Sequence, residues 1–294
     1  MIYEGFEYSS AFVDRVVEYY GTHDKFLVGP ESRIRYVADV LIPELETYVG
    51  DLDGVRVADF GCGTASSTVA LRAAGATVEG YDIDETAVSI GQDRLKEHGF
   101  EDVVLRSGPS AAVAGLEPGV FDVVYLNAVL EHVPIPDRPR VLADAAALLR
   151  PGGHLALAQS PNRWWPRDVY LTGLWFLPWL PSGSRLAARY ASSFGRQRHS
   201  IRPTPEGGRA LELRGVPGIT YPATLRALPP GTTCRNAEPH RRSTMSTEPT
   251  SRHRRLFERF VATCIKPLTG LPVAAFVPMF SLLVFRIPDA PPGS

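Results

Sequence analysis

VADFGCGTAS, residues 57–66, is the stretch that decides the fold of this 294-residue chain. A short apolar run carries Asp59 near its end, and two glycines follow before a segment of small residues. Glycine adopts left-handed backbone conformations and has no Cβ, so Gly61 and Gly63 permit a tight turn and the close approach of a ligand. The pattern predicts a strand, a glycine loop, and a helix whose first N–H groups are open to that ligand.

Strand-like and helix-like segments alternate after this stretch. Such alternation is typical of an α/β fold, a Rossmann-like doubly wound sheet with helices on both faces. Residues 11–49 carry helical periodicity, so an N-terminal helical cap precedes the sheet. We expect strands at 76–84, 102–108, 121–128 and 154–160, and helices at 66–75, 85–99 and 138–153, the helix at 66 beginning with a serine cap and that at 138 ending at Pro151-Gly152-Gly153.

An acidic residue follows the glycine loop at a sequence spacing that is typical of nucleotide-binding folds. Asp82 ends the next predicted strand, 21 residues after Gly61. An acid about 20 residues downstream of such a loop is placed to accept hydrogen bonds from ribose hydroxyls. The two features together predict a nucleoside-containing ligand.

A dinucleotide fits this pattern poorly. The third glycine of the dinucleotide fingerprint is replaced by Ser66, and Asp59 would repel a pyrophosphate. An acid at 59 suits a ligand with a cationic amino-acid portion. A nicotinamide dehydrogenase on the same kind of sheet is therefore disfavoured.

The residues resemble the class I S-adenosylmethionine (SAM)-dependent methyltransferases of the small-molecule type. The resemblance covers about residues 55–160. Its five motifs occur in order: Asp59-Phe60-Gly61-Cys62-Gly63-Thr64, Gly80-Tyr81-Asp82-Ile83-Asp84, Phe121-Asp122-Val123-Val124, Leu130-Glu131-His132-Val133 and Leu149-Arg150-Pro151-Gly152-Gly153. It implies a seven-stranded sheet, mostly parallel with an antiparallel last strand, which residues 280–287 would supply.

The resemblance also implies a SAM site. Asp59 and its two glycines would surround the methionine part, Asp82 would hold the ribose with Ile83 against the adenine, and Asn127 would lie near the sulfonium. The family often has Gly-Asp-Ala where this chain has 108–110, so the adenine would be held by Ser110, by a backbone group or by no polar group at all. The implied cofactor-binding residues are Asp59, Gly61, Cys62, Gly63, Thr64, Asp82, Ile83, Ser110 and Asn127. Cys62 is interpreted as a small residue tolerated between glycines rather than as a nucleophile.

Two residues after the fourth strand are candidates for catalysis. Oxygen and nitrogen acceptors often require removal of a proton, and the imidazole of a histidine such as His132 is a side chain suited to that task. Glu131 is its neighbour. The alternative is that one or both serve folding or the shape of the SAM pocket. The chain shows no zinc-like His/Cys spacing, and we expect no metal.

All four tryptophans lie within residues 161–181. This segment follows the fifth strand, on the side of the sheet where ligands bind. Trp164, Trp165 and Trp175 are predicted to form a wall or lid for an apolar acceptor. The alternatives are a local core and a peripheral membrane contact. Tyr19 and Tyr20 could cap the SAM pocket or serve as packing residues.

The net charge of −1 hides a skew along the chain. Residues 196–255 hold 12 arginines against four glutamates, whereas arginine outnumbers lysine 28 to 3 in the whole chain, which indicates a GC-rich genome. The stretch lacks interleaved aromatics, and after the fourth strand Asn127-Ala128-Val129-Leu130 lacks the motif of base-amine methyltransferases. Nucleic acid is therefore an unfavoured partner.

These features divide the chain into four parts. Residues 1–50 are the helical cap, 51–195 the SAM-binding core with the Trp-rich segment, 196–256 a basic, Pro-rich insertion that is irregular or disordered, and 257–294 a helix and the last strand. Three scattered cysteines, no signal-peptide pattern, and apolar stretches too short for a transmembrane segment predict a cytoplasmic protein. Nothing in the pattern specifies an oligomeric state.

The function predicted from the sequence is methyl transfer from SAM to a small, apolar or aromatic metabolite, in bacterial secondary metabolism. The alternative is a SAM-fold protein that no longer methylates and serves as a binding or scaffold protein, in peripheral contact with a membrane. The missing acid at position 109 and the basic stretch motivate that alternative.

Overall fold

The computed structural model describes residues 6–21, 33–112, 114–168, 173–180, 185–194, 218–236, 256, 259–276 and 279–289. One seven-stranded sheet organises them, in the order β3-β2-β1-β4-β5-β7-β6. The strands are β1 (Arg56–Phe60), β2 (Thr77–Asp82), β3 (Val104–Ser107), β4 (Phe121–Asn127), β5 (Leu149–Pro161), β6 (Thr233–Cys234) and β7 (Met279–Arg286).

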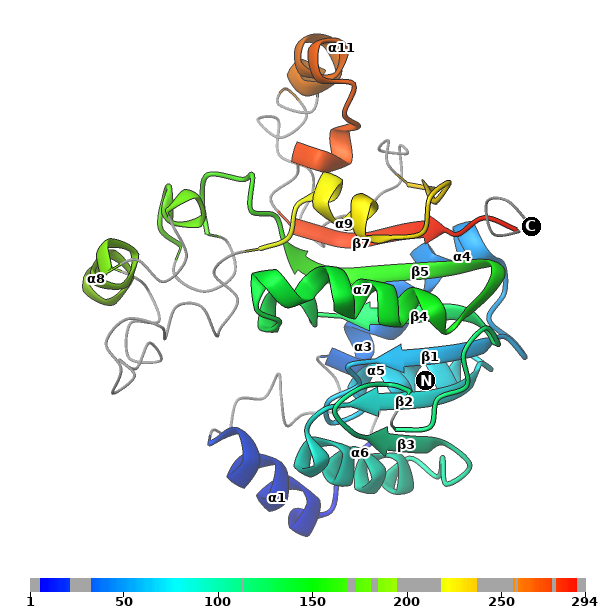
Figure 1. Ribbon diagram of the computed structural model, residues 1–294. Helices are drawn as coiled ribbons and strands as arrows, with labels where there is room; N and C mark the ends of the chain where they lie inside the picture. Colours follow the sequence, from blue (N-terminus) through cyan, green and yellow to red (C-terminus); the bar gives the residue numbers. More distant parts are fainter. Residues whose placement is uncertain are drawn as a thin grey trace.

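The sheet is parallel from β3 to β5, and β7 runs antiparallel beside β5. The predicted doubly wound sheet with an antiparallel last strand is confirmed. The strand order reverses at β1, where β2 lies on one side and β4 on the other. The carboxyl ends of the parallel strands therefore meet at one edge, on the left of Figure 1, where ligands of such sheets bind.

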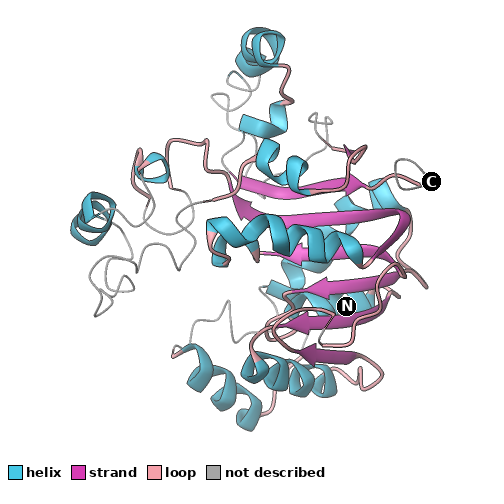
Figure 2. Cartoon of the chain, in the orientation of Figure 1, coloured by secondary structure: helices cyan, strands magenta, loops and turns pink. Residues whose placement is uncertain are grey.

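Helices cover both faces of the sheet (Figures 1 and 2). Among the described residues, the α-helices are α1 (Ser10–Tyr20), α3 (Arg33–Tyr36), α4 (Ile42–Val49), α5 (Ser66–Ala73), α6 (Glu85–Glu97), α7 (Arg138–Ala147), α8 (Arg185–Phe194), α9 (Tyr221–Ala227) and α11 (Lys266–Thr269). Shorter helical segments are η1 (Val37–Leu41), η2 (Leu130–His132), η3 (Ile135–Asp137), η4 (Leu177–Trp179), η7 (Val261–Ile265) and η8 (Val273–Phe276).

Two hydrophobic cores lie on opposite sides of the sheet. The first joins α3, η1, α4 and α5 to the side chains of Val57, Val123 and Tyr125. The second joins α7 and α9 to Val124 and Leu126. Successive strand residues point to opposite faces, so alternate residues of β4 enter alternate cores. Three of the N-terminal helical segments, α3, η1 and α4, thus share one layer of the fold with α5.

Local sequence explains where the helices next to the site begin and end. Asp84 accepts hydrogen bonds from the N–H groups of Thr86 and Ala87 and so caps α6, which stops before the left-handed Gly99. The predicted serine cap of the helix at 66 is wrong. Residue 65 is an alanine in the left-handed region, and α5 begins at Ser66 without a side-chain cap.

Two expected boundaries also need correction. The glycines at 152 and 153 do not belong to the end of α7, because β5 already starts at Leu149 and passes through an irregularity in its pairing with β4. Residues 218–236 are not part of an irregular insertion, because they form α9 and β6, and β6 pairs with β7. The rest of the basic stretch lies almost entirely outside the described residues. No described helix is long and apolar enough to cross a membrane.

Candidate active site

The glycine loop between β1 and α5 is shaped by two glycines with different tasks. Gly61 has φ +82°, and a Cβ there would lie 2.5 Å from a methyl carbon of Val129, so its missing side chain makes room for the turn after β4. Gly63 has φ +50°, and a Cβ there would meet no atom within 4 Å. The open space for a ligand is therefore at Gly63.

Asp82 closes this loop from the end of β2. Its Oδ2 accepts the Gly63 N–H at 2.8 Å, and its Oδ1 accepts the Asp84 N–H at 2.9 Å. Burial raises the pKa of Asp82, and these two backbone donors oppose the shift. The next side chain, Ile83, is 75% exposed, which is unusual for a large aliphatic group beside a buried sheet edge. The carboxylate of Asp82, a hydrogen-bond acceptor, and the exposed apolar side chain of Ile83 are thus neighbours.

Asp59 is buried at the end of β1, with only 1% of its surface exposed. Its Oδ2 accepts a hydrogen bond of 2.6 Å from the hydroxyl of Thr68. Burial raises the pKa of Asp59 to about 7, while Thr68 and the nearby positive charge of Arg33 act in the opposite direction. This acid is positioned to gain from a cation that enters beside it.

Asn127 ends β4 and is also buried. Its Nδ2 donates to the Ser67 hydroxyl at 2.9 Å, which leaves its Oδ1 buried without a partner. A buried acceptor without a donor is costly, and such an atom indicates a place where a ligand group is expected. The next residue, Ala128, has φ +57°.

Backbone strain gathers at this edge of the sheet. Of the described non-glycine residues with positive φ, three follow or approach a strand end: Ala65 after β1, Ala128 after β4 and Gln159 near the end of β5. Such conformations cost about 1–3 kcal/mol each and tend to occur at functional sites. The strained positions therefore mark the same edge as the polar residues.

Three other predicted cofactor residues have structural contacts. Cys62 is buried, and burial raises the pKa of its thiol well above the ordinary value, so it packs as a neutral small residue against Gly80. The Thr64 hydroxyl lies 3.2 Å from that of Tyr20. Ser110 is half-buried in the loop after β3, whose Gly108 carbonyl accepts a 3.0 Å hydrogen bond from Tyr81.

The two catalytic candidates differ sharply in exposure. Glu131 is fully buried, with one carboxylate oxygen 3.5 Å from the Ser160 hydroxyl and the other without a partner. Burial raises the pKa of Glu131 to about 7, against the opposing charges of Arg33 and Arg138. His132 is exposed on the same 3-10 turn. Among the described residues, no group of His, Cys, Asp and Glu has the arrangement of a metal site.

The Trp-rich segment continues from β5. Trp164 is 38% exposed and packs at a tilt against Phe276, with ring centroids 5.7 Å apart, and Trp165 is half-buried. Trp175 and Trp179 are 52% and 54% exposed, and Phe176 lies between them. The segment is anchored because the carbonyl of Pro161 accepts the Ile219 N–H at 2.9 Å. Residues 169–172 lie outside the described part.

Comparison with known proteins identifies this arrangement. Residues 58–157 match the family model described as a methyltransferase domain. The ubiquinone biosynthesis O-methyltransferase of Leptothrix cholodnii is 30% identical over 204 residues, 67% of this chain and 83% of that protein. The protein of the same name from Methylococcus capsulatus is 30% identical over 70% of this chain and 84% of its own length.

The chain belongs to the class I SAM-dependent methyltransferases. Its cofactor is SAM. Among solved structures, the magnesium protoporphyrin IX methyltransferase of Synechocystis PCC 6803, determined with bound S-adenosylhomocysteine (SAH), is similar over 52% of this chain and 68% of its own, with 26% identity and a TM-score of 0.39. The membership places the chain among enzymes rather than among scaffold proteins.

The residues of the site fit SAM. Open space at Gly63, the unpartnered Oδ1 of Asn127 and the bare side chain of Ile83 are all features that a bound nucleoside with an amino-acid tail would complete. Asp59 would face the ammonium group of the tail and Asp82 the ribose. SAM supplies a methyl group carried on a positively charged sulfur.

Sequence reasoning missed Arg33. Its positive charge lowers the pKa values of Asp59, Tyr125 and Glu131, so it contributes to the electrostatics of this edge of the sheet. The only signal in the sequence was one arginine among 28, at the start of a helix. Its influence on these residues depends on how the chain folds α3 back onto the sheet, which no local pattern records.

Proposed function

We propose that this enzyme transfers the methyl group of SAM to a hydroxyl oxygen of an apolar, aromatic small molecule. The observation that carries the proposal is the aromatic segment at the carboxyl end of β5, beside the strand ends that hold Asp59 and Asn127. Support for oxygen as the acceptor atom comes from the relatives, which are named O-methyltransferases of ubiquinone biosynthesis.

The acceptor would lie against the tryptophans. Trp164 and Trp175 expose 38% and 52% of their surface, and aromatic rings bind other rings through stacking and edge contacts. Trp165, half-buried between them in the chain, would support the wall. A phenol with an apolar substituent matches such a surface because the substituent gains from leaving water.

His132 is the residue we propose for removal of the acceptor proton. Its ring is exposed at the edge where β4 ends, and an ordinary imidazole exchanges protons near neutral pH. Glu131 is enclosed between β4 and Ser160, so its carboxylate would keep the turn in place rather than meet the acceptor. Glu131 would thus hold the turn in position, and His132 would accept the proton.

Arg33, Asp59 and Asn127 would hold the amino-acid end of the cofactor. A guanidinium suits a carboxylate, and the Asp59 carboxylate and the Asn127 Oδ1 suit an ammonium. With the amino-acid end and the ribose of SAM both fixed, the reacting methyl group would point in a single direction, toward the acceptor. Positioning of this kind can contribute about 7–11 kcal/mol to catalysis.

The test is a methyl-transfer assay with labelled SAM and a matched set of acceptors. The set contains a catechol, the same catechol with alkyl tails of increasing length, an aniline and a methylene-active ketone, with products identified by mass. We expect transfer to the hydroxyl, with kcat/KM rising with tail length. Transfer to nitrogen or carbon while every phenol remains unmodified would refute the proposal.

Two variants sharpen the assignment. Trp175→Ala should raise KM for the longest-tailed acceptor about fivefold or more and leave KM for SAM unchanged. Leu268→Ala, at the 85% exposed residue of α11, is the matched control and should change neither. His132→Gln should lower kcat about 100-fold or more while SAM binding persists. An unchanged kcat would reassign proton removal to water.

The metabolic setting belongs to the same proposal. The composition favours bacterial secondary metabolism, whereas the relatives are named for ubiquinone biosynthesis. Incubation of labelled SAM with a metabolite extract of the host, followed by identification of the methylated product, decides between these settings.

A further inference from the structure

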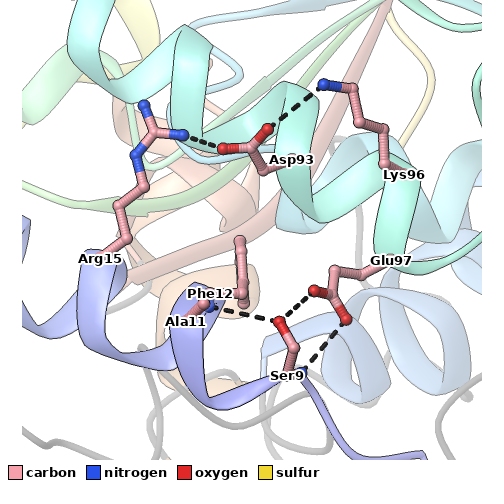
Figure 3. A pocket seen from close by; sticks show the side chains of 7 residues that line it. All are labelled: Ser9, Ala11, Phe12, Arg15, Asp93, Lys96 and Glu97. Atoms are coloured by element: carbon pink, nitrogen blue, oxygen red, sulfur yellow. Dashed lines mark hydrogen bonds and ion pairs between the residues drawn. The ribbon is translucent and has the colours of Figure 1, made fainter.

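The N-terminal helix makes a small interface of its own with α6. Phe12, Val16 and Ile90 are buried together there, apart from the two main cores. A hollow of about 540 Å³ lies along this interface, and Figure 3 shows the side chains from both helices that line it. Arg15 pairs with Asp93 across it, and Asp93 also pairs with Lys96. No residue assigned to the cofactor lines this hollow, so it belongs to the docking of α1.

A buried arginine lies at the centre of this interface. Arg94 of α6 has no exposed surface. Its Nε donates to the carbonyl oxygen of Thr64 at 2.7 Å, and its guanidinium also donates to the Tyr8 hydroxyl at 2.9 Å. The guanidinium carbon lies 5.3 Å from the ring centre of Tyr8 and 5.1 Å from that of Phe12. One side chain thus joins the start of α1 to the glycine loop.

The C-terminal end of α1 contacts the loops after β1 and β2, which carry predicted cofactor residues. The Tyr19 hydroxyl donates to Asp84 at 2.8 Å, next to the ribose acid. The Tyr20 hydroxyl lies 3.2 Å from that of Thr64. Thr64 is therefore held from two sides, through its carbonyl by α6 and through its hydroxyl by α1.

We propose that Arg94 is a positioning residue for SAM. Arg94 fixes the glycine loop through Thr64 only when α1 is docked, because Tyr8 and Phe12 then enclose its guanidinium. Without the two rings, the guanidinium would face water on one side and gain less from the Thr64 carbonyl. Docking of α1 and the shape of the loop at Gly63 are then one coupled event. This inference concerns SAM binding alone and does not depend on which acceptor is methylated.

Coupling of this kind is reciprocal, because each event must favour the other by the same factor. SAM should therefore stabilise docked α1 as much as docked α1 strengthens SAM binding. Amide hydrogen exchange in residues 10–20 of the full chain should slow on addition of SAM or SAH. Exchange in β7, which carries no residue assigned to SAM and is separated from β1 by β4 and β5, is the internal reference.

The decisive variant is Arg94→Met, which keeps the apolar stem and removes the guanidinium. We expect the Kd for SAM and the KM for SAM to rise about tenfold or more, while kcat at saturating SAM changes less than about threefold. SAM should no longer slow exchange in residues 10–20. A purely structural role would lower Tm and leave the Kd of the folded fraction unchanged.

Arg15→Met is the matched control. Arg15 links the same two helices but touches no cofactor loop, and its pair with Asp93 is partly exposed. Pairs of this kind contribute little, so the Kd for SAM should stay within about twofold. Tyr20→Phe should raise the Kd for SAM. In the double variant Tyr20→Phe/Arg94→Met, the rise of the Kd should be smaller than the product of the two single fold-changes.

Tyr8→Phe covers the case in which Arg94→Met does not fold. It keeps the ring over Arg94 and removes only the hydroxyl that accepts from Arg94 and contacts His98. A smaller rise of the Kd in the same direction supports the proposal. Unchanged SAM affinity in folded Arg94→Met or Tyr8→Phe overturns it, as does SAM binding that leaves the exchange of α1 in the wild type untouched.

Discussion

The affinity for SAM should depend on pH through Asp59. Burial holds the pKa of this carboxyl at about 7 in the free protein. A SAM ammonium beside the carboxylate favours the ionised form, so the pKa falls on binding and a proton is released. Affinity is then highest where Asp59 is already ionised, and it weakens as the pH falls through 7.

The size of the effect follows from the ionised fraction. With a pKa of about 7, that fraction drops from about 0.76 at pH 7.5 to about 0.03 at pH 5.5. The Kd for SAM should rise about 25-fold over this interval, equivalent to about 1.9 kcal/mol. The interval stays below the pKa of an ordinary α-amino group, about 7.7–8.0, so most of the ligand carries the ammonium charge throughout.

Titration calorimetry at five pH values, in buffers of different ionisation enthalpy, measures both the Kd and the proton released. Asp59→Asn keeps the acceptor for Thr68 and should bind SAM weakly and with a much shallower slope; the slope that remains would come from Asp82 and Glu131, whose pKa values are also raised. Thr68→Val removes a hydrogen bond that favours the carboxylate, so it should move the midpoint above 7. A Kd that stays constant from pH 5.5 to 7.5, or a slope in Asp59→Asn as steep as in the wild type, would refute this role of Asp59.

Three further predictions separate cofactor binding from folding. Ile83→Ala, at a side chain that is 75% exposed, should leave Tm unchanged and weaken SAM and SAH binding about fivefold, as calorimetry would measure. Gly61→Ala should lower Tm because of its contact with Val129, and Val129→Ala should partly restore it, whereas Gly63→Ala should chiefly weaken SAM binding. Asp82→Asn should weaken SAH binding about tenfold or more, since the ribose loses an anionic acceptor, and equal affinity would contradict that assignment.

The strands and the cofactor acids were predictable because local patterns specify them. The apolar run before Gly61 and the spacing to Asp82 fix which residues reach the carboxyl edge, and β4 and β7 follow from short, mostly apolar runs. The pairing order places these ends together without further information.

The remainder depends on contacts far apart in the chain. Arg94 meets Thr64 across 30 residues and Tyr8 across 86, so its role leaves no local trace. Segment β6 has two residues and α9 has seven, too short for periodicity to stand out from a stretch rich in Arg and Pro. Glu131 and His132 differ in exposure because successive side chains of a 3-10 turn point about 120° apart, which composition cannot indicate.

The two ends of the proposed cofactor site would rely on different physics. At Asp59 the interaction would be electrostatic, in a buried region and coupled to a proton. At Ile83 it would be the removal of exposed apolar surface from water, which does not change with pH. A variant at Ile83 should therefore shift the whole pH profile of the Kd without altering its shape, whereas a variant at Asp59 should flatten it. If both variants flatten the pH profile of the Kd, the Asp59 and Ile83 ends of the site do not act independently. The glycine loop, whose Gly63 N–H donates to Asp82, would then be the element that connects them.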